Sequence, residues 1–248
     1  MKKTLIALFL TMISGLVYGQ DRVQALSKNK YFHFDIGIGY TNAQLGSINN
    51  TLSNYGYKTF SEDMATFSIS SNYYFNRLLI KSELVWFFPQ DVEQTGDLTT
   101  QFGGRSIGIG LGYAIIQKPS YRITPYLGLN AYTGRLSFID DASVENIEDA
   151  LNNTFRNTDL SFSNGALDVG IQMEKLIELK NRKWDCPQNS RFMTVGIRLG
   201  YNFGFGEARG RYNGDQVIEN APTYSIEGPY LKAIIGFGSK IRNIKWKN

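Results

Sequence analysis

Residues 31–40 read YFHFDIGIGY, and apolar side chains occupy every second position of this stretch. A period of two is the period of a β-strand, in which successive side chains point to opposite faces. One face is wholly apolar, whereas the other carries a histidine, an aspartate and two glycines, which do not suit a dry protein core. The stretch therefore predicts a strand with lipid on one side and water or polar packing on the other, as in a transmembrane β-barrel.

The same alternation recurs up to residue 238, in segments near the roughly 9 to 11 residues that cross a bilayer at a tilt. Eight strands are expected, at residues 31–41, 64–75, 78–88, 105–116, 123–133, 165–174, 192–203 and 229–238. Short connections alternate with long ones at residues 42–63, 89–104, 134–164 and 204–228. We predict an all-β fold, an eight-stranded antiparallel up-and-down transmembrane β-barrel with long extracellular loops. Ten strands are an alternative if the first or fourth long loop contains a further hairpin.

The ends of the chain suggest export. Two lysines followed by a short apolar run are typical of a signal peptide, which we place at residues 1–19. The expected organisation continues with a periplasmic N-terminal segment at 20–30, the outer-membrane barrel at 31–238 and a basic periplasmic tail at 239–248. The only cysteine, Cys186, cannot form an intrachain disulfide, and its role stays open.

Charge orients the predicted barrel. Each long loop is net negative, whereas the N-terminal segment, the three shorter links and the tail are each net positive. Bacterial outer-membrane barrels keep their short turns in the periplasm, so the acidic loops are expected outside. Because the positive charge lies on one rim, the overall charge of +4 does not predict nucleic-acid binding.

Seven charged residues share the inward parity of these strands. An eight-stranded barrel is just wide enough for its side chains to fill it, so such groups must pair to offset their desolvation. We expect a salt-bridged plug with a structural role, and a proton or ion relay is the alternative. The predicted lumen charge network comprises Asp35, Lys81, Glu83, Asp168, Glu174, Arg198 and Lys232.

Catalysis and cofactor binding have little support. His33 and Asp35 share the inward face of the first strand, a pairing that suits a lipid-modifying enzyme, but no G-x-S-x-G nucleophile motif accompanies them. One histidine and one cysteine do not predict a metal site, and the glycines spaced by two follow the strand period rather than a phosphate loop. We predict no enzyme activity, no cofactor and no metal.

Aromatic residues gather at the strand ends, where amphipathic rings favour the lipid headgroup zone. They predict two girdles, with Tyr31, Phe32, Tyr73, Phe75, Tyr121 and Phe192 on the periplasmic side and Trp86, Phe88, Tyr132, Tyr201 and Phe203 on the outer side. Helical spacing occurs in the first long loop from Leu45 to Tyr55 and in the third from Val144 to Phe155. These segments either fold over the outer mouth or are mobile loops.

Two stretches, PYLGLNAYTG at 125–134 and GPYLKAIIGFG at 228–238, carry a resemblance. With the signal peptide and the glycine-alternating strands, they resemble small outer-membrane β-barrel proteins of Gram-negative bacteria. The architecture is similar to the OmpA transmembrane domain and OmpX, and in style to the porin-family barrels of Bacteroidota. The resemblance implies that Phe237 is the signal for the barrel-assembly machinery, although eleven residues follow it. The peptidoglycan-binding domain of OmpA-like proteins is absent from this sequence.

The leading hypothesis is a non-enzymatic outer-membrane protein with a structural or surface-interaction role. Its expected partners are outer-membrane lipid, lipopolysaccharide, the assembly machinery and a protein that binds the extracellular loops. A narrow porin-like channel or a small barrel subunit of an export machine is the alternative, followed by the lipid-modifying enzyme.

Overall fold

The computed structural model describes residues 30–94, 98–140, 157–179, 189–206, 208–212, 216–217 and 222–241. Several predictions fall outside these residues. They are the signal peptide, nearly all of the N-terminal segment, Cys186, the helix from Val144 to Phe155 and most of the basic tail.

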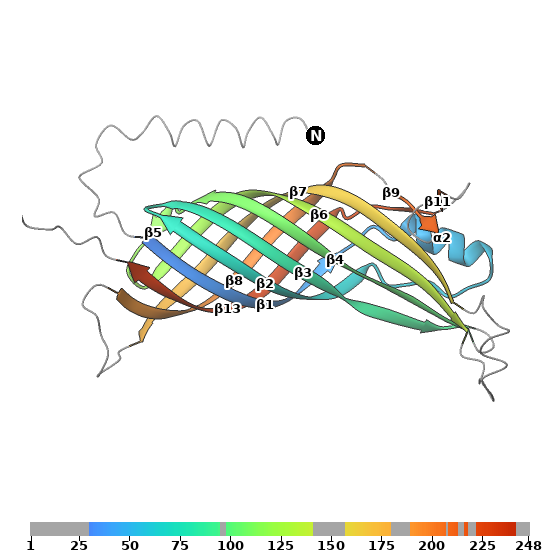
Figure 1. Ribbon diagram of the computed structural model, residues 1–248, viewed down its shortest axis with the longest axis horizontal. Coiled ribbons are helices and arrows are strands. Elements are labelled where there is room, and N and C mark those ends of the chain that lie inside the picture. The colour runs from blue at the N-terminus through green and yellow to red at the C-terminus, as the bar shows by residue number, and fades with distance from the viewer. Residues whose placement is uncertain are drawn as a thin grey trace, which may run out of the picture.

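Eight long antiparallel strands close into a ring (Figure 1). Each strand pairs with the next along the chain, and β13 pairs with both β8 and β1 to complete the barrel. The predicted eight-stranded up-and-down fold is therefore confirmed. The ring comprises β1 (Lys30–Asn42), β2 (Asp63–Phe75), β3 (Leu78–Glu93), β4 (Leu98–Tyr113), β6 (Tyr121–Asp140), β7 (Asn157–Leu179), β8 (Asn189–Gly204) and β13 (Gly228–Ile241).

The short strands lie outside the ring, so the ten-stranded alternative is wrong. β10 pairs with the outer part of β7 and with β11, β9 pairs with β12, and β5 pairs with the start of β6. Their bounds are β5 (Ile116–Gln117), β9 (Ala208–Arg209), β10 (Arg211–Tyr212), β11 (Gln216–Val217) and β12 (Thr223–Tyr224).

The outward faces of the ring form an apolar wall. Alternate residues of β1 are buried and exposed, and Ile38 on β1 and Ile109 on β4 are each 66% exposed. In water such a surface would be strongly unfavourable, but hydrocarbon solvates it, and a closed ring leaves no unpaired strand edge in the bilayer. The protein is an outer-membrane β-barrel. Among the described residues, no helix is both long and apolar enough to cross a membrane.

Several strands run further than predicted on the outer side. β6 has 20 residues and β7 has 23, and their pairing continues to Ile139 and Asn157. Residues 134–140 and 157–164 of the third predicted loop therefore belong to the sheet. Here the outward side chains are polar because they lie beyond the lipid, so the apolar alternation that reveals the membrane strands is lost. At the opposite end of the barrel, Asn76 lies in the turn between β2 and β3. Its φ of 56° is in the left-handed region, which asparagine adopts more readily than most residues.

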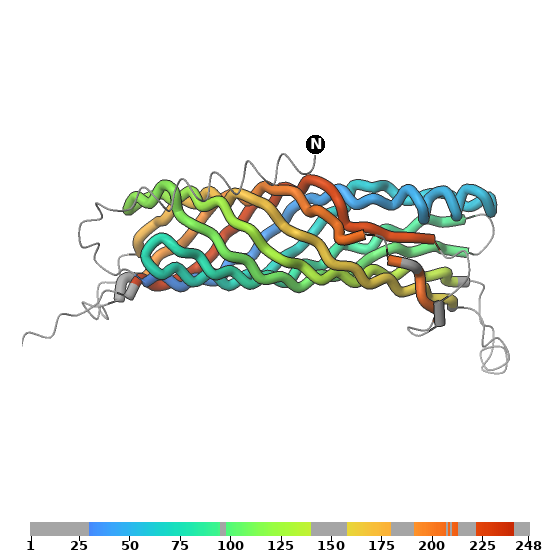
Figure 2. Tube along the Cα trace, turned by 90° about the horizontal axis from the view of Figure 1, so that it is seen from above, coloured from blue at the N-terminus to red at the C-terminus, as the bar shows by residue number. Residues whose placement is uncertain are grey.

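A helix and a hydrophobic cluster close the outer end. Helix α2 (Gly46–Asn54) confirms the predicted helix in the first long loop, with Ile48 and Leu52 buried. Both views place α2 at the outer end, away from the β2–β3 turn (Figures 1 and 2). Tyr55, which the pattern placed on the same helical face, is 77% exposed because the helix ends before it.

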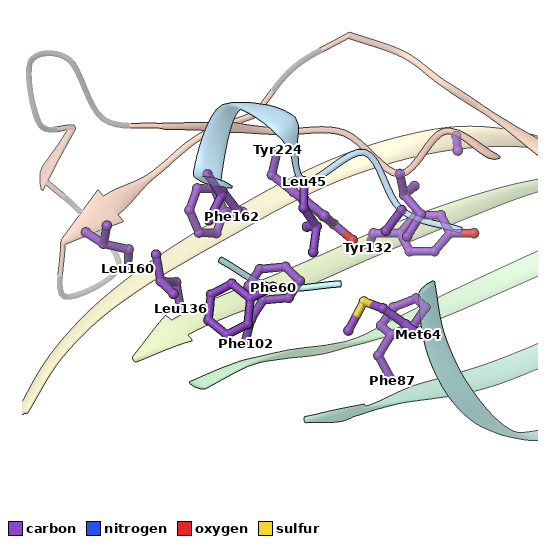
Figure 3. Packing of buried hydrophobic residues seen from close by; sticks show 14 of the residues in the cluster. Leu45, Phe60, Met64, Phe87, Phe102, Tyr132, Leu136, Leu160, Phe162 and Tyr224 are labelled. Carbon is purple, nitrogen blue, oxygen red and sulfur yellow. The ribbon is translucent and has the colours of Figure 1, made fainter. Parts of the chain in front are cut away.

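The hydrophobic side chains beneath α2 form what we call the outer apolar cluster (Figure 3). It joins residues of α2 and the long loops to inward residues of the strand extensions. Its members are Ala43, Leu45, Ile48, Leu52, Phe60, Met64, Val85, Phe87, Phe102, Tyr132, Leu136, Leu160, Phe162, Ala166, Tyr224 and Ile226.

Three amide side chains hold the segment that follows α2. Each of them bonds both the N–H and the C=O of one loop residue, as a neighbouring strand would. Asn49 pairs in this way with Phe60, Gln90 with Ser61 and Gln94 with Lys58, at 2.6–3.2 Å. The loop therefore lies against β3 without a continuous strand ladder.

Candidate functional site

Glu83 on β3 lies at the centre of a charged network inside the barrel. Its Oε1 accepts hydrogen bonds from Arg198 Nη1 at 2.7 Å and from Lys232 Nζ at 2.9 Å. Its Oε2 lies 3.1 Å from Lys81 Nζ. One carboxylate thus meets three cations from three strands, and all four side chains are nearly inaccessible to solvent.

A second centre surrounds Glu174, nearer the periplasmic end. Arg122 Nε donates to Oε2 at 2.9 Å, and the hydroxyl of Tyr74 donates to the same oxygen at 3.2 Å. His33 Nε2 lies 2.9 Å from Oε1. Tyr74 also stacks its ring on His33 and lies face-on to the Arg122 guanidinium at 3.4 Å, so this ion pair is enclosed by aromatic rings.

Asp35 connects the two centres. Its Oδ2 accepts from Asn72 at 2.7 Å and lies 3.6 Å from Arg198, while its Oδ1 accepts from Thr194 at 3.0 Å. His33 Nε2 is 3.5 Å from Asp35 Oδ1. The charged network is therefore continuous from Glu174 to Glu83.

At Asp168 the network ends in a chain of hydroxyls. Tyr230 donates to Asp168 Oδ1 at 2.5 Å, and Tyr126 donates to the Tyr230 hydroxyl. Asp168 Oδ2 lies 3.7 Å from Lys81 Nζ. Gly170 faces both tyrosines, and a Cβ at that position would lie 2.6 Å from each hydroxyl oxygen. The inward glycine thus provides the space in which the two tyrosines meet.

All seven residues of the predicted lumen charge network are buried in the structure, none more than 6% exposed. Sequence reasoning missed an eighth, Arg122, because it assigned this residue to a turn. Arg122 is the second residue of β6 and has the same parity as the inward Thr124 and Tyr126. With it, four carboxylates face four arginine and lysine side chains, so these eight charges balance.

Three residues predicted for the aromatic girdles face the barrel interior and not the lipid. Tyr31 and Phe192 face the interior, where their rings pack edge-to-face, and Tyr132 donates to Asn202 at 2.9 Å. Each has the parity of the inward residues of its strand, which decides its direction more strongly than its place at a strand end. Phe32, Phe75, Trp86, Phe88 and Tyr121 are exposed on the wall, and Tyr73, Tyr201 and Phe203 are partly exposed.

Phe237 lies on the lipid-facing wall and is 60% exposed. It sits opposite Phe34 and Met193, and β13 continues past it to Ile241. Its role as an assembly signal stays a prediction.

Apolar side chains flank the network on both sides. We call the side nearer the turns the periplasmic apolar cluster, formed by Tyr31, Tyr74, Leu79, Ala114, Tyr126 and Phe192. The outer apolar cluster lies on the other side, and Tyr132 and Phe87 of that cluster stack. Between them, beside Glu83 and Asp168, is a cavity of about 20 Å³, large enough for about one water molecule.

Ligand atoms of His33, Asp35 and Glu174 lie within 4.8 Å of one another, which is close enough for a shared metal ion. Both carboxylates already face arginines, Asp35 facing Arg198 and Glu174 facing Arg122. A divalent cation would add charge to a balanced network, so the donor set does not fit a metal. His33 itself is fully buried.

No protein-family model matches the sequence, and no curated protein matches it. Among solved structures, the chain is similar to Neisserial surface protein A at 14% identity, with 86% of this chain and 97% of that chain covered and a TM-score of 0.37. It is also similar to Ail, the attachment invasion locus protein of Yersinia pestis, at 11% identity, 87% and 100% coverage and a TM-score of 0.41. The outer membrane protein OprG from Pseudomonas aeruginosa matches at 13% identity, 88% and 97% coverage and a TM-score of 0.37.

Proposed function

We propose that this protein is a closed outer-membrane barrel with a structural or surface-interaction role, and that its lumen does not conduct ions. The observation that carries the proposal is the Glu83 centre, in which one buried carboxylate binds three cations across the ring. An ion that crosses the barrel would have to replace at least one of these contacts.

The apolar clusters add two further barriers. A hydrated ion that enters from the periplasm meets Tyr31, Tyr74 and Phe192, and one that enters from outside meets the side chains beneath α2. Ions lose their hydration shell in such layers at a cost of many kcal/mol unless polar groups replace the water. Interior side chains fill small eight-stranded barrels generally, which agrees with this arrangement.

The outer side of the molecule favours interaction at the cell surface. The sheet continues beyond the apolar wall. Buried side chains hold α2 on it, and the three amide pairs hold the segment that follows α2. An ordered surface of this kind suits contact with neighbouring lipids or proteins better than free loops do, since less conformational entropy is lost on binding.

Planar-bilayer conductance tests the closed lumen. The wild-type protein is expected to give no stable unitary current. A variant that lacks both long central side chains, Glu83→Ala with Arg198→Ala, is expected to raise the current, whereas the wall variant Ser71→Ala is the matched control. A steady wild-type current with a defined unit size would instead support the narrow-channel alternative and overturn the proposal.

A further inference from the structure

Three arginines lie close together on the outward face of the sheet, near the extracellular end of the barrel. Arg135 on β6 is directly opposite Ser161 on β7, and Ser161 is directly opposite Arg211 on β10. Arg105 on β4 is directly opposite Thr133, two residues before Arg135. All three arginines are exposed and have outward parity. We call Arg105, Arg135 and Arg211 the outer arginine patch.

The pairing register sets how far apart these arginines are. Paired strands lie about 4.8 Å apart, which puts the Cα atoms of Arg135 and Arg211 about 10 Å from each other. Arg105 and Arg135 are diagonal neighbours on adjacent strands, at about 7–8 Å. Because an arginine side chain is long, three guanidinium groups at these separations can reach one multivalent anion.

The patch lies at the outer edge of the apolar wall. On β4 the next outward residue toward the membrane after Arg105 is Ile107, which is 60% exposed. On β6, Leu129 lies six residues before Arg135 and is 53% exposed. Trp86, a residue type favoured at the membrane interface, is directly opposite Arg105. The headgroup layer adds roughly 5–8 Å on each side of the hydrocarbon core, so residues just beyond the apolar wall are expected to lie in it.

The charge of the patch contrasts with its surroundings, since all four long loops are net negative. Arg135 pairs with Asp159. Among the residues that the structure describes, neither Arg105 nor Arg211 has a carboxylate within ion-pair distance. The hydroxyl residues Thr133, Ser161 and Ser163 lie between the arginines, so hydrogen-bond donors surround the cations.

We propose that the outer arginine patch binds the phosphorylated headgroup of a glycolipid in the outer leaflet. Guanidinium groups bind phosphate through paired charge-assisted hydrogen bonds, and the low polarity beside the bilayer strengthens them. Lipopolysaccharide has this chemistry. The inference depends on the placement of the barrel in the outer membrane and does not require the lumen to be closed.

The test uses the purified full-length protein in detergent and measures lipid binding by native mass spectrometry. The probes are lipid A that carries phosphate, the same lipid A after phosphatase treatment, and inorganic phosphate. The test variant is Arg105→Gln with Arg211→Gln, which leaves the Arg135–Asp159 pair intact. Arg191→Gln is the matched control, because Arg191 is an exposed arginine on the periplasmic end of β8.

The wild type is expected to prefer phosphorylated over dephosphorylated lipid A, and the double variant is expected to bind it at least about tenfold more weakly, since each lost charge-assisted bond is worth about a factor of ten. Arg191→Gln should bind like the wild type. Asp159→Asn, which frees Arg135, should bind more tightly. Equal binding of the two lipids, an unaffected double variant, or inorganic phosphate that competes at the affinity of the lipid would each overturn the proposal.

Discussion

Removal of the Glu83 carboxylate should strongly destabilise the barrel. In Glu83→Gln the shape of the side chain is kept, but the contacts to Arg198, Lys232 and Lys81 at 2.7, 2.9 and 3.1 Å lose their charge. Four cations then face three carboxylates in the lumen, so one buried positive charge is uncompensated. Loss of one partner from a buried ion pair typically costs about 3–5 kcal/mol, and we expect a decrease of this size in the free energy of unfolding.

Urea-induced unfolding in lipid vesicles, followed by tryptophan fluorescence, measures this loss. A second change that restores neutrality, Lys232→Met in the Glu83→Gln background, should recover about 1–3 kcal/mol, because the two residues are coupled. Ser71→Ala is the control. Among the residues that the structure describes, the Ser71 hydroxyl bonds only the Ser82 hydroxyl on the lipid-facing wall, so the change should alter stability by about 1 kcal/mol or less. A Glu83→Gln protein as stable as Ser71→Ala, or a double variant no better than the single one, would refute this reasoning.

Three further predictions concern packing, pH and the outer helix. Gly200→Val should prevent folding, because the new side chain would overlap the Tyr230 hydroxyl, whereas Gly46→Ala, with open space around it, should keep the heat-dependent gel shift of a folded barrel. The hydrogen bond from Arg135 holds the pKa of Asp159 below its usual range. This exposed pair should therefore contribute at most about 1 kcal/mol to the free energy of unfolding above pH 4. The contribution should be lost as the pH falls through the folded-state pKa of Asp159. Chemical unfolding of Asp159→Asn should therefore depend less on pH in this range. Leu52→Asp places a charge in the outer apolar cluster and should release α2, which limited proteolysis within residues 55–62 would detect, while a protected loop would contradict the docking of the helix.

The sequence was sufficient to predict the strands of the ring, because each membrane strand must place apolar residues toward the lipid at every second position. Apolar residues alternate with glycines, hydroxyls and charges, so the inward parity of Glu83 and Arg198 could be read directly. The same rule, applied strictly, would have placed Tyr31, Tyr132 and Phe192 inside. Their assignment to the girdles followed their position along the strand and ignored parity. Arg122 was missed because its strand was taken to begin one residue later.

Two features could not be read from alternation. The strand extensions above the membrane have polar outward faces, so β6 and β7 lose the apolar signal beyond Thr133 and Gly165 although their pairing continues. The contacts of Glu83 join residues up to 149 positions apart in sequence. Parity predicts that such groups share the lumen, but which pairs meet depends on strand stagger and side-chain length, which only the structure supplies.

The Glu83 centre also bears on the order in which the barrel assembles. Lys81 is on the same strand as Glu83 and is present as soon as β3 forms, whereas Arg198 and Lys232 arrive with β8 and β13, the last two strands of the ring. Until β13 pairs with β1, the carboxylate lacks part of its charge compensation. Joining the first strand to the last therefore both closes the hydrogen-bonded ladder and completes the neutral interior, so a partly assembled sheet is less suited to remain in the bilayer than the finished barrel.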